Sequence, residues 1–285
     1  MNISEKAMLV GLSISAWSGR KYDKDASLEV AQNHGTDVNR AGRFNKILVN
    51  PTSLRDITYI SGKARDYTMT STLPWLNDGI RIIPVDIYLE YMQKMSDYKS
   101  QFNVAVDKLA NEYEALVNQA RLDLNGLFKE SDYPSVDSIR RKHAFNVRVF
   151  NLPDSNDFRV NLSESEFQST KQEIEQNLND AVDGAVKDVF YRVKMRMEHM
   201  LKRIKEAEAT DGKGIRESMI KNIVELSDII PKLNITGNVD ISSIARKIKD
   251  ELTVISADDL RENQSSRIAA SQSAKEILDK VSAYI

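Results

Sequence analysis

The sequence predicts a mainly helical protein with a small antiparallel β element, an α+β class built around two long helices. Three observations predict it. Apolar residues across 88–127 recur at alternating steps of four and three, which is a heptad seam. A second apolar stripe runs across 167–204. Between the two stripes, residues 145–149 and 158–162 alternate apolar and polar side chains, as strands do.

The first 70 residues predict two strands and one helix. Apolar residues alternate with small or polar ones across 10–16, which indicates a strand near the start. Residues 18–44 are polar and contain glycine, so we expect an irregular loop, followed by a short second strand at 47–49. Ser53 with Asp56 three residues later is a capping signal for a helix that continues through Tyr67.

The first long helix is predicted from Val85 to Phe128. Pro84 suits the beginning of a helix, and the next glycine or proline is Gly126. About 44 helical residues would be about 65 Å long. The seam contains only Lys99 and Asp123 as polar members.

The second long helix is predicted to begin at a capping box formed by Ser163 and Glu166 and to end near Ala209. Because an exposed apolar stripe of this length is unfavourable in water, we expect the two long helices to pair as an antiparallel hairpin or coiled coil. A β-hairpin at about 144–162 is expected near one end, with the N-terminal strand as its third strand.

The C-terminal region is predicted to be helical. The stretch 210–214 is glycine-containing and reads as a linker. Shorter helices are expected at about 215–230, ended by Pro231, and then at 240–253 and 257–284. We therefore expect three regions along the chain: 1–84, a helical hairpin with its β insert over 85–209, and a helical region over 215–285.

Composition excludes several classes of site. The 285 residues include no cysteine, so disulfides, thiolate metal sites and cysteine nucleophiles are excluded. The three histidines, His34, His143 and His199, lack metal-ligand spacing, and no phosphate-binding loop occurs. We expect no metal, no cofactor and no catalytic constellation. Apolar runs too short for a bilayer and the absent cysteines favour a cytoplasmic protein without a membrane span.

Basic clusters are the candidate nucleic-acid contacts, although the net charge is only −2. Arg140, Arg141 and Lys142 precede the first strand of the expected hairpin. Arg192, Arg196 and Arg203 share roughly one face near the end of the second long helix, at steps of four and seven. Phosphate contact is one interpretation. The alternative is a solvated helix end, where cations are favourable by themselves.

Trp75 and Arg81 are the candidate partner-binding residues. They are predicted on a loop between helices, and loops held by a rigid scaffold often carry function. The alternative is that Trp75 fills the junction between the loop and the long helix, with Arg81 stacking on its ring.

An ordered series of motifs over residues 8–162 resembles a known family. The motifs are Trp17-Ser18-Gly19-Arg20-Lys21 with Asp23, Arg43-Phe44-Asn45-Lys46, Thr72-Leu73-Pro74-Trp75 with Gly79, Arg81 and Pro84, Tyr133-Pro134, and Asp157-Phe158-Arg159-Val160. The series is similar to a domain-of-unknown-function family of uncharacterised phage and prophage proteins. The resemblance implies a protein of the bacterial host cytoplasm that accompanies AAA+ ATPases of the MoxR type and von Willebrand A proteins. It implies no catalytic residue.

Two functions follow as hypotheses. The first is a non-enzymatic interaction or scaffold protein that self-associates as a homo-oligomer or docks an AAA+ or von Willebrand A partner. The second is a single-stranded DNA-binding or annealing protein of phage recombination. The heptad seams favour the first hypothesis, and the basic clusters beside a small sheet favour the second.

Overall fold

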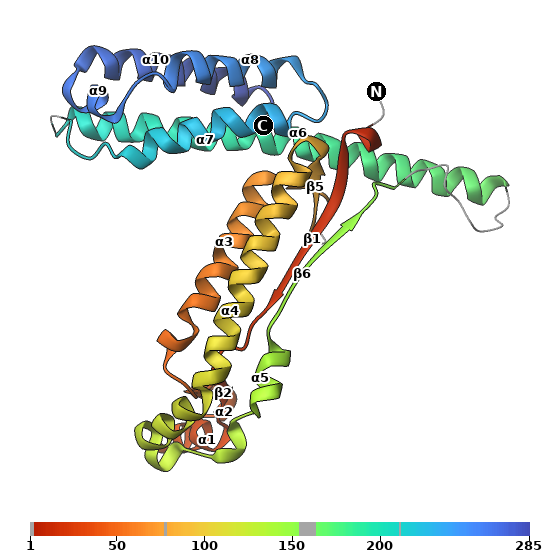
Figure 1. The fold of residues 1–285 in the computed structure, drawn as a ribbon. Helices are drawn as coiled ribbons and strands as arrows, with labels where there is room; N and C mark the ends of the chain where they lie inside the picture. The colour runs from red at the N-terminus through yellow and green to blue at the C-terminus, as the bar shows by residue number, and fades with distance from the viewer. Residues whose placement is uncertain (1–2, 77–78, 154–163, 211) are drawn as a thin grey trace. The chain divides into compact units, whose positions relative to one another are not determined.

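The computed structural model describes residues 3–76, 79–153, 164–210 and 212–285 (Figure 1). The predicted class, mainly helical with a small antiparallel β element, is confirmed. Within these residues, every helix is either too short or too polar to cross a lipid bilayer.

The larger sheet has four strands in the order β4-β5-β1-β6. Their bounds are Leu73–Pro74 for β4, Ile80–Pro84 for β5, Ala7–Ser15 for β1 and Ala144–Phe150 for β6. β1 and β5 pair antiparallel, with Ala7 opposite Pro84 and Gly11 opposite Ile80. The expected N-terminal strand therefore lies beside the first strand of the expected hairpin, while the second hairpin strand, 158–162, lies outside the described residues.

The chain divides into two compact units, each assembled from separate stretches of sequence. Unit 1 contains Met1–Gly11, Thr68–Tyr91 and Arg148–Ile285, and unit 2 contains Leu12–Tyr67 and Met92–Val147. These units cut across the three consecutive regions expected from the sequence, because β1, β6 and the helices α3 (Arg55–Ser71) and α4 (Val85–Leu124) each contribute residues to both.

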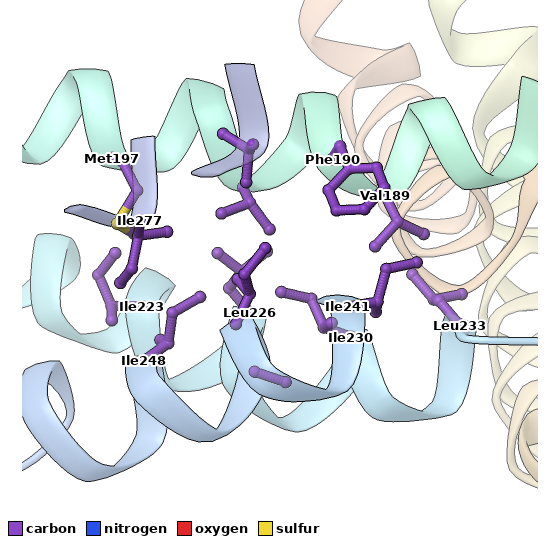
Figure 2. Close-up of a cluster of buried hydrophobic side chains, with 14 of the residues drawn as sticks. Val189, Phe190, Met197, Ile223, Leu226, Ile230, Leu233, Ile241, Ile248 and Ile277 are labelled. Carbon is purple, nitrogen blue, oxygen red and sulfur yellow. The ribbon is translucent and has the colours of Figure 1, made fainter. Parts of the chain in front are cut away.

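Unit 1 is largely a helical assembly around α6 (Glu164–Glu208). The apolar stripe of α6 is buried from Ala181 to Ala207. It packs mainly against α10 (Gln264–Ser282), and the core includes side chains of the intervening helices (Figure 2). Those helices are α7 (Glu217–Leu233), α8 (Val239–Lys247), a π-helical turn (Ile248–Leu252) and α9 (Ala257–Glu262).

The expected pairing of the two long helices with each other is wrong for α6. Phe190 of α6 stacks on Tyr284 just after α10, with ring centroids 4.1 Å apart, and Met197 lies near Ile277 of α10, so α6 and α10 run antiparallel. A heptad seam requires a covering partner but does not specify which helix supplies it. The C-terminal helices carry apolar faces of their own and cover α6, whereas α4 belongs to unit 2 from Met92 onward.

Three other expectations need correction. The segment 18–44 is not an irregular loop, because it contains β2 (Arg20–Tyr22), α1 (Lys24–Asn33) and α2 (Val38–Ala41). The side chain of Asp23 begins α1 by accepting the backbone N–H groups of Asp25 and Ala26. Pro231 does not end α7 but lies in its last turn. The final expected helix is two helices, divided at Asn263.

Unit 2 contains β2, α1, α2, most of α3 and α4, and three further short elements that matter for the site. These are β3 (Asn45–Ile47), which pairs antiparallel with β2, the 3-10 turn Glu130–Asp132, and α5 (Val136–Lys142). The seam of α4 is buried at Phe102, Leu109 and Tyr113, and its predicted polar members Lys99 and Asp123 are exposed.

Candidate functional site

A buried lysine lies at the centre of unit 2. The side chain of Lys46 in β3 is 1% exposed, and its Nζ lies 2.8 Å from Oδ2 of Asp23 and 2.6 Å from Oδ2 of Asp132. Nζ also donates to the backbone carbonyl of Leu127 at 2.8 Å. A buried charge is tolerated only when it is paired and hydrogen-bonded. Lys46 has three acceptors for the three hydrogens of its ammonium group.

The two carboxylates are held by further donors. Asp132 accepts a hydrogen bond from Nζ of Lys21 at 2.8 Å, and Asp23 caps α1 through backbone N–H groups. Asp23, Lys46 and Asp132 are buried, and the Lys21 side chain is 48% exposed; these four side chains are called the buried charge cluster below. Their formal charges balance when all four are ionised.

The cluster favours its ionised state. The hydrogen bond from Lys46 is the main reason that the pKa of Asp23 falls to about 2, with the backbone N–H of Ala26 next. For Asp132, burial raises the pKa, but the hydrogen bonds from Lys21 and Lys46 outweigh it and the net shift is downward. For Lys46, burial by itself lowers the pKa. The hydrogen bonds to Asp132 and Asp23 raise it by more, so the net shift is upward. A protonated amine with all its hydrogens donated is not a base or nucleophile, so the cluster acts as a support.

The cluster lies beneath one face of the β2–β3 sheet. Lys21 pairs with Lys46 across the strands, while Arg20 pairs with Ile47 and Tyr22 with Asn45. Because side chains alternate along a strand, the last four residues are directed away from the cluster. Arg43 joins them, since its guanidinium carbon lies 5.7 Å from the centroid of the Tyr22 ring. We call Arg20, Tyr22, Arg43, Asn45 and Ile47 the β2–β3 outer face, and all five are exposed.

An aromatic group accompanies the cluster in unit 2. Trp17 packs edge-on against Tyr113, with ring centroids 5.9 Å apart. The backbone N–H of Trp17 donates to Nε2 of His143 at 3.3 Å, while the other ring nitrogen, Nδ1, lies 2.8 Å from the carbonyl of Ile139. Burial lowers the pKa of His143 and raises that of Tyr113 to about 12. His143 is therefore a packed neutral residue.

Unit 1 brings together two arginines that the sequence placed in different candidate sites. Arg81 is on β5, where its Nε donates to the hydroxyl of Thr72 at 2.6 Å and its Nη2 donates to the Thr72 carbonyl at 3.1 Å. Arg192 of α6 donates to the carbonyls of Thr70 at 2.8 Å and Thr72 at 2.6 Å, and pairs with Asp188 at 2.7 Å. The last carbonyls of a helix lack intrahelical partners, so these arginines cap the C-terminal end of α3. Burial, then the neighbouring Arg192, lowers the pKa of Arg81.

The remaining predicted site residues are dispersed. Trp75 follows β4 rather than lying on a loop between helices, and it is buried in the core of unit 1. Arg140, Arg141 and Lys142 form the exposed last turn of α5, where Arg140 pairs with Asp107. On α6, Arg196 is exposed and Arg203 pairs with Glu206 at 2.8 Å. Arg192, Arg196 and Arg203 therefore do not form one free row.

Sequence reasoning did not identify the buried charge cluster or the outer face. It grouped Trp17, Lys21, Asp23, Lys46 and Tyr133 only as motif residues, although all five lie in unit 2. The available signal was the alternation of side-chain direction along the strand around residue 46. It puts Lys46 on the opposite face of the strand from Asn45 and Ile47.

Metal binding finds no support in the described ranges, where no three acidic or histidine side chains gather in a way that would hold an ion. Comparison with known protein families, curated proteins and solved structures gave no match to this chain.

Proposed function

We propose that the chain is a non-enzymatic interaction protein that self-associates or docks a protein partner, and that the β2–β3 outer face is the docking surface. The observation that carries this proposal is the composition of that face. Tyr22 and Ile47 are 43% and 45% exposed, and they lie beside two arginines on an open two-stranded sheet. Tyrosine and arginine are enriched at protein interfaces and among the residues that dominate binding energy.

The support beneath this face suits a docking role. Binding is less costly when the contact residues are already held in position, because less side-chain and loop freedom is lost. The buried charge cluster fixes both strands from below through Lys21 and Lys46. It also connects them to α1 through Asp23 and to the 3-10 turn through Asp132.

The partner class follows from two considerations. The face carries two arginines and no carboxylate, so it favours an acidic surface on the partner. The resemblance to the phage and prophage family implies a MoxR-type AAA+ ATPase or a von Willebrand A protein as that partner. The proposal assigns this chain the role of adaptor or client of such a machine.

The proposal is tested by co-expressing the full chain with a MoxR-type ATPase and a von Willebrand A protein from the same genome. Light scattering after size exclusion then gives the mass of each species. We expect a complex or a homo-oligomer that Tyr22→Ala with Ile47→Ser disrupts. The matched control is Tyr59→Ala, because Tyr59 on α3 is 64% exposed and has Lys63 over its ring, but lies outside the outer face. A strict monomer that binds neither partner contradicts the proposal, as does equal loss of binding in the control.

A further inference from the structure

A second surface lies on the exposed side of α6, in unit 1. Six of its residues recur at steps of four, three, four, four and three, which places them on one side of a helix. They are Lys187, Tyr191, Lys194, Glu198, Lys202 and Lys205. We call them the α6 stripe. The opposite side of the same helix segment is buried through Val189, Val193 and Met197, so this part of α6 is anchored by its apolar face.

The stripe is electropositive. Its four lysines and one glutamate give a formal charge of +3. In the part of the chain that the structure describes, none of these lysines forms an ion pair, whereas Arg192 and Arg203 on the same helix are engaged by Asp188 and Glu206. The stripe thus differs from the arginine row expected from the sequence. Arg192 and Arg203 are occupied by the protein itself, while Arg196 and three of the four stripe lysines, Lys187, Lys202 and Lys205, are exposed and Lys194 is half-buried.

The stripe also carries an exposed aromatic ring. Tyr191 is 50% exposed, and Met195 beside it is 46% exposed. A solvated helix face has no need of a half-exposed tyrosine among lysines. Aromatic rings between cations are what a single-stranded nucleic acid requires, because unpaired bases stack on the ring while the cations neutralise phosphates. In a duplex the bases are already stacked on one another.

We propose that the α6 stripe binds single-stranded nucleic acid, with the lysines on phosphates spaced along the strand and Tyr191 stacking on a base. From residue 187 to residue 205 the helix extends about 27 Å, which is enough for several nucleotides. This site is separate from the β2–β3 outer face and does not depend on the docking proposal.

The experiment measures fluorescence anisotropy of a labelled single-stranded oligonucleotide of about 20 nucleotides with the full chain, over a series of salt concentrations. Each neutralised phosphate contributes about 0.7 to the slope of log affinity against log salt, so four contacts give a slope of about −3. Replacing Lys187, Lys194, Lys202 and Lys205 by Gln should remove about 3 from that slope. Tyr191→Ala should weaken binding about tenfold and leave the slope unchanged.

The matched control replaces four exposed lysines elsewhere in unit 1, Lys213, Lys221, Lys249 and Lys275, by Gln. This variant has the same net charge as the stripe variant, and its slope should stay close to that of the parent chain. Three results overturn the proposal: no binding at low salt, equal slopes for the stripe and control variants, or equally strong binding of a polyglutamate peptide. The last result would assign the stripe to an acidic protein segment.

Discussion

Replacing Lys46 by Met should strongly destabilise unit 2. Methionine matches lysine closely in length, so the change removes the ammonium group without opening a large cavity. Three hydrogen bonds are lost, two of them to carboxylates that stay buried. Removing one partner of a buried ion pair costs about 3–5 kcal/mol. Asp132 keeps Lys21 and Asp23 keeps its backbone donors, so we expect the lower end, about 3 kcal/mol.

The chain allows this cost to be measured in one unit. It has two tryptophans, Trp17 in unit 2 and Trp75 in unit 1. In a Trp75→Phe background, urea unfolding followed by tryptophan fluorescence therefore reports on unit 2. The control is Lys108→Met, because the Lys108–Asp56 pair in the same unit is about 60% exposed on both sides. An exposed pair contributes less than about 1 kcal/mol. If Lys46→Met and Lys108→Met lower the free energy of unfolding equally, the buried charge cluster does not hold unit 2 together.

Three further predictions concern stability. Burial lowers the pKa of His143 below its ordinary 6.5, so the folded state binds fewer protons than the unfolded state. The unfolding free energy of unit 2 should therefore fall as pH drops below about 6.5, and His143→Gln should flatten this dependence in urea titrations. The similar loss from Asp23 should appear only between pH 3.8 and about 2, so an unchanged slope near pH 6 in the Gln variant would refute the assignment. Arg192→Met should cost about 2–3 kcal/mol in unit 1, because it uncovers the carbonyls of Thr70 and Thr72, whereas Arg196→Met on the same helix should stay within about 0.5 kcal/mol. Equal costs, measured by Trp75 fluorescence in a Trp17→Phe background, would show that α3 does not need this cap. Leu109→Lys should cost several kcal/mol because Leu109 is 1% exposed, while Leu116→Lys should cost less because residue 116 is only partly buried. Circular dichroism melting compares the two variants, and an unchanged melt for Leu109→Lys would mean that the seam of α4 is misplaced.

The sequence predicted the two long helices well because their signals are local. Pro84 precedes α4 directly, and the apolar period of three and four continues through both helices. The partner of α6 was not predictable in the same way. An apolar stripe shows only that one side of a helix must be covered. In the sequence, both α4 and the C-terminal helices carry apolar faces that could cover α6. The choice of α10 depends on tertiary packing, such as the stacking of Phe190 on Tyr284.

The buried charge cluster was not predictable for a related reason. A lysine is normally exposed, and the two carboxylates that allow Lys46 to be buried are 23 residues before it and 86 residues after it. No periodic pattern connects positions 23, 46 and 132. The short helices α1 and α2 were missed because a helix of ten residues or fewer offers too few turns for a clear period.

The motif Arg43-Phe44-Asn45-Lys46 shows why motif residues cannot be divided into structural and functional ones by sequence alone. In a strand, neighbouring side chains face opposite sides, so Lys46 supports the sheet from below while Arg43 and Asn45 belong to its outer face. The same alternation separates Arg20 from Lys21 on the paired strand. A strand that must both hold a buried charge and present a surface carries the two sets of residues interleaved. Substitutions at alternate positions along each strand therefore test different properties: stability at Lys21 and Lys46, and binding at Arg20, Tyr22, Asn45 and Ile47.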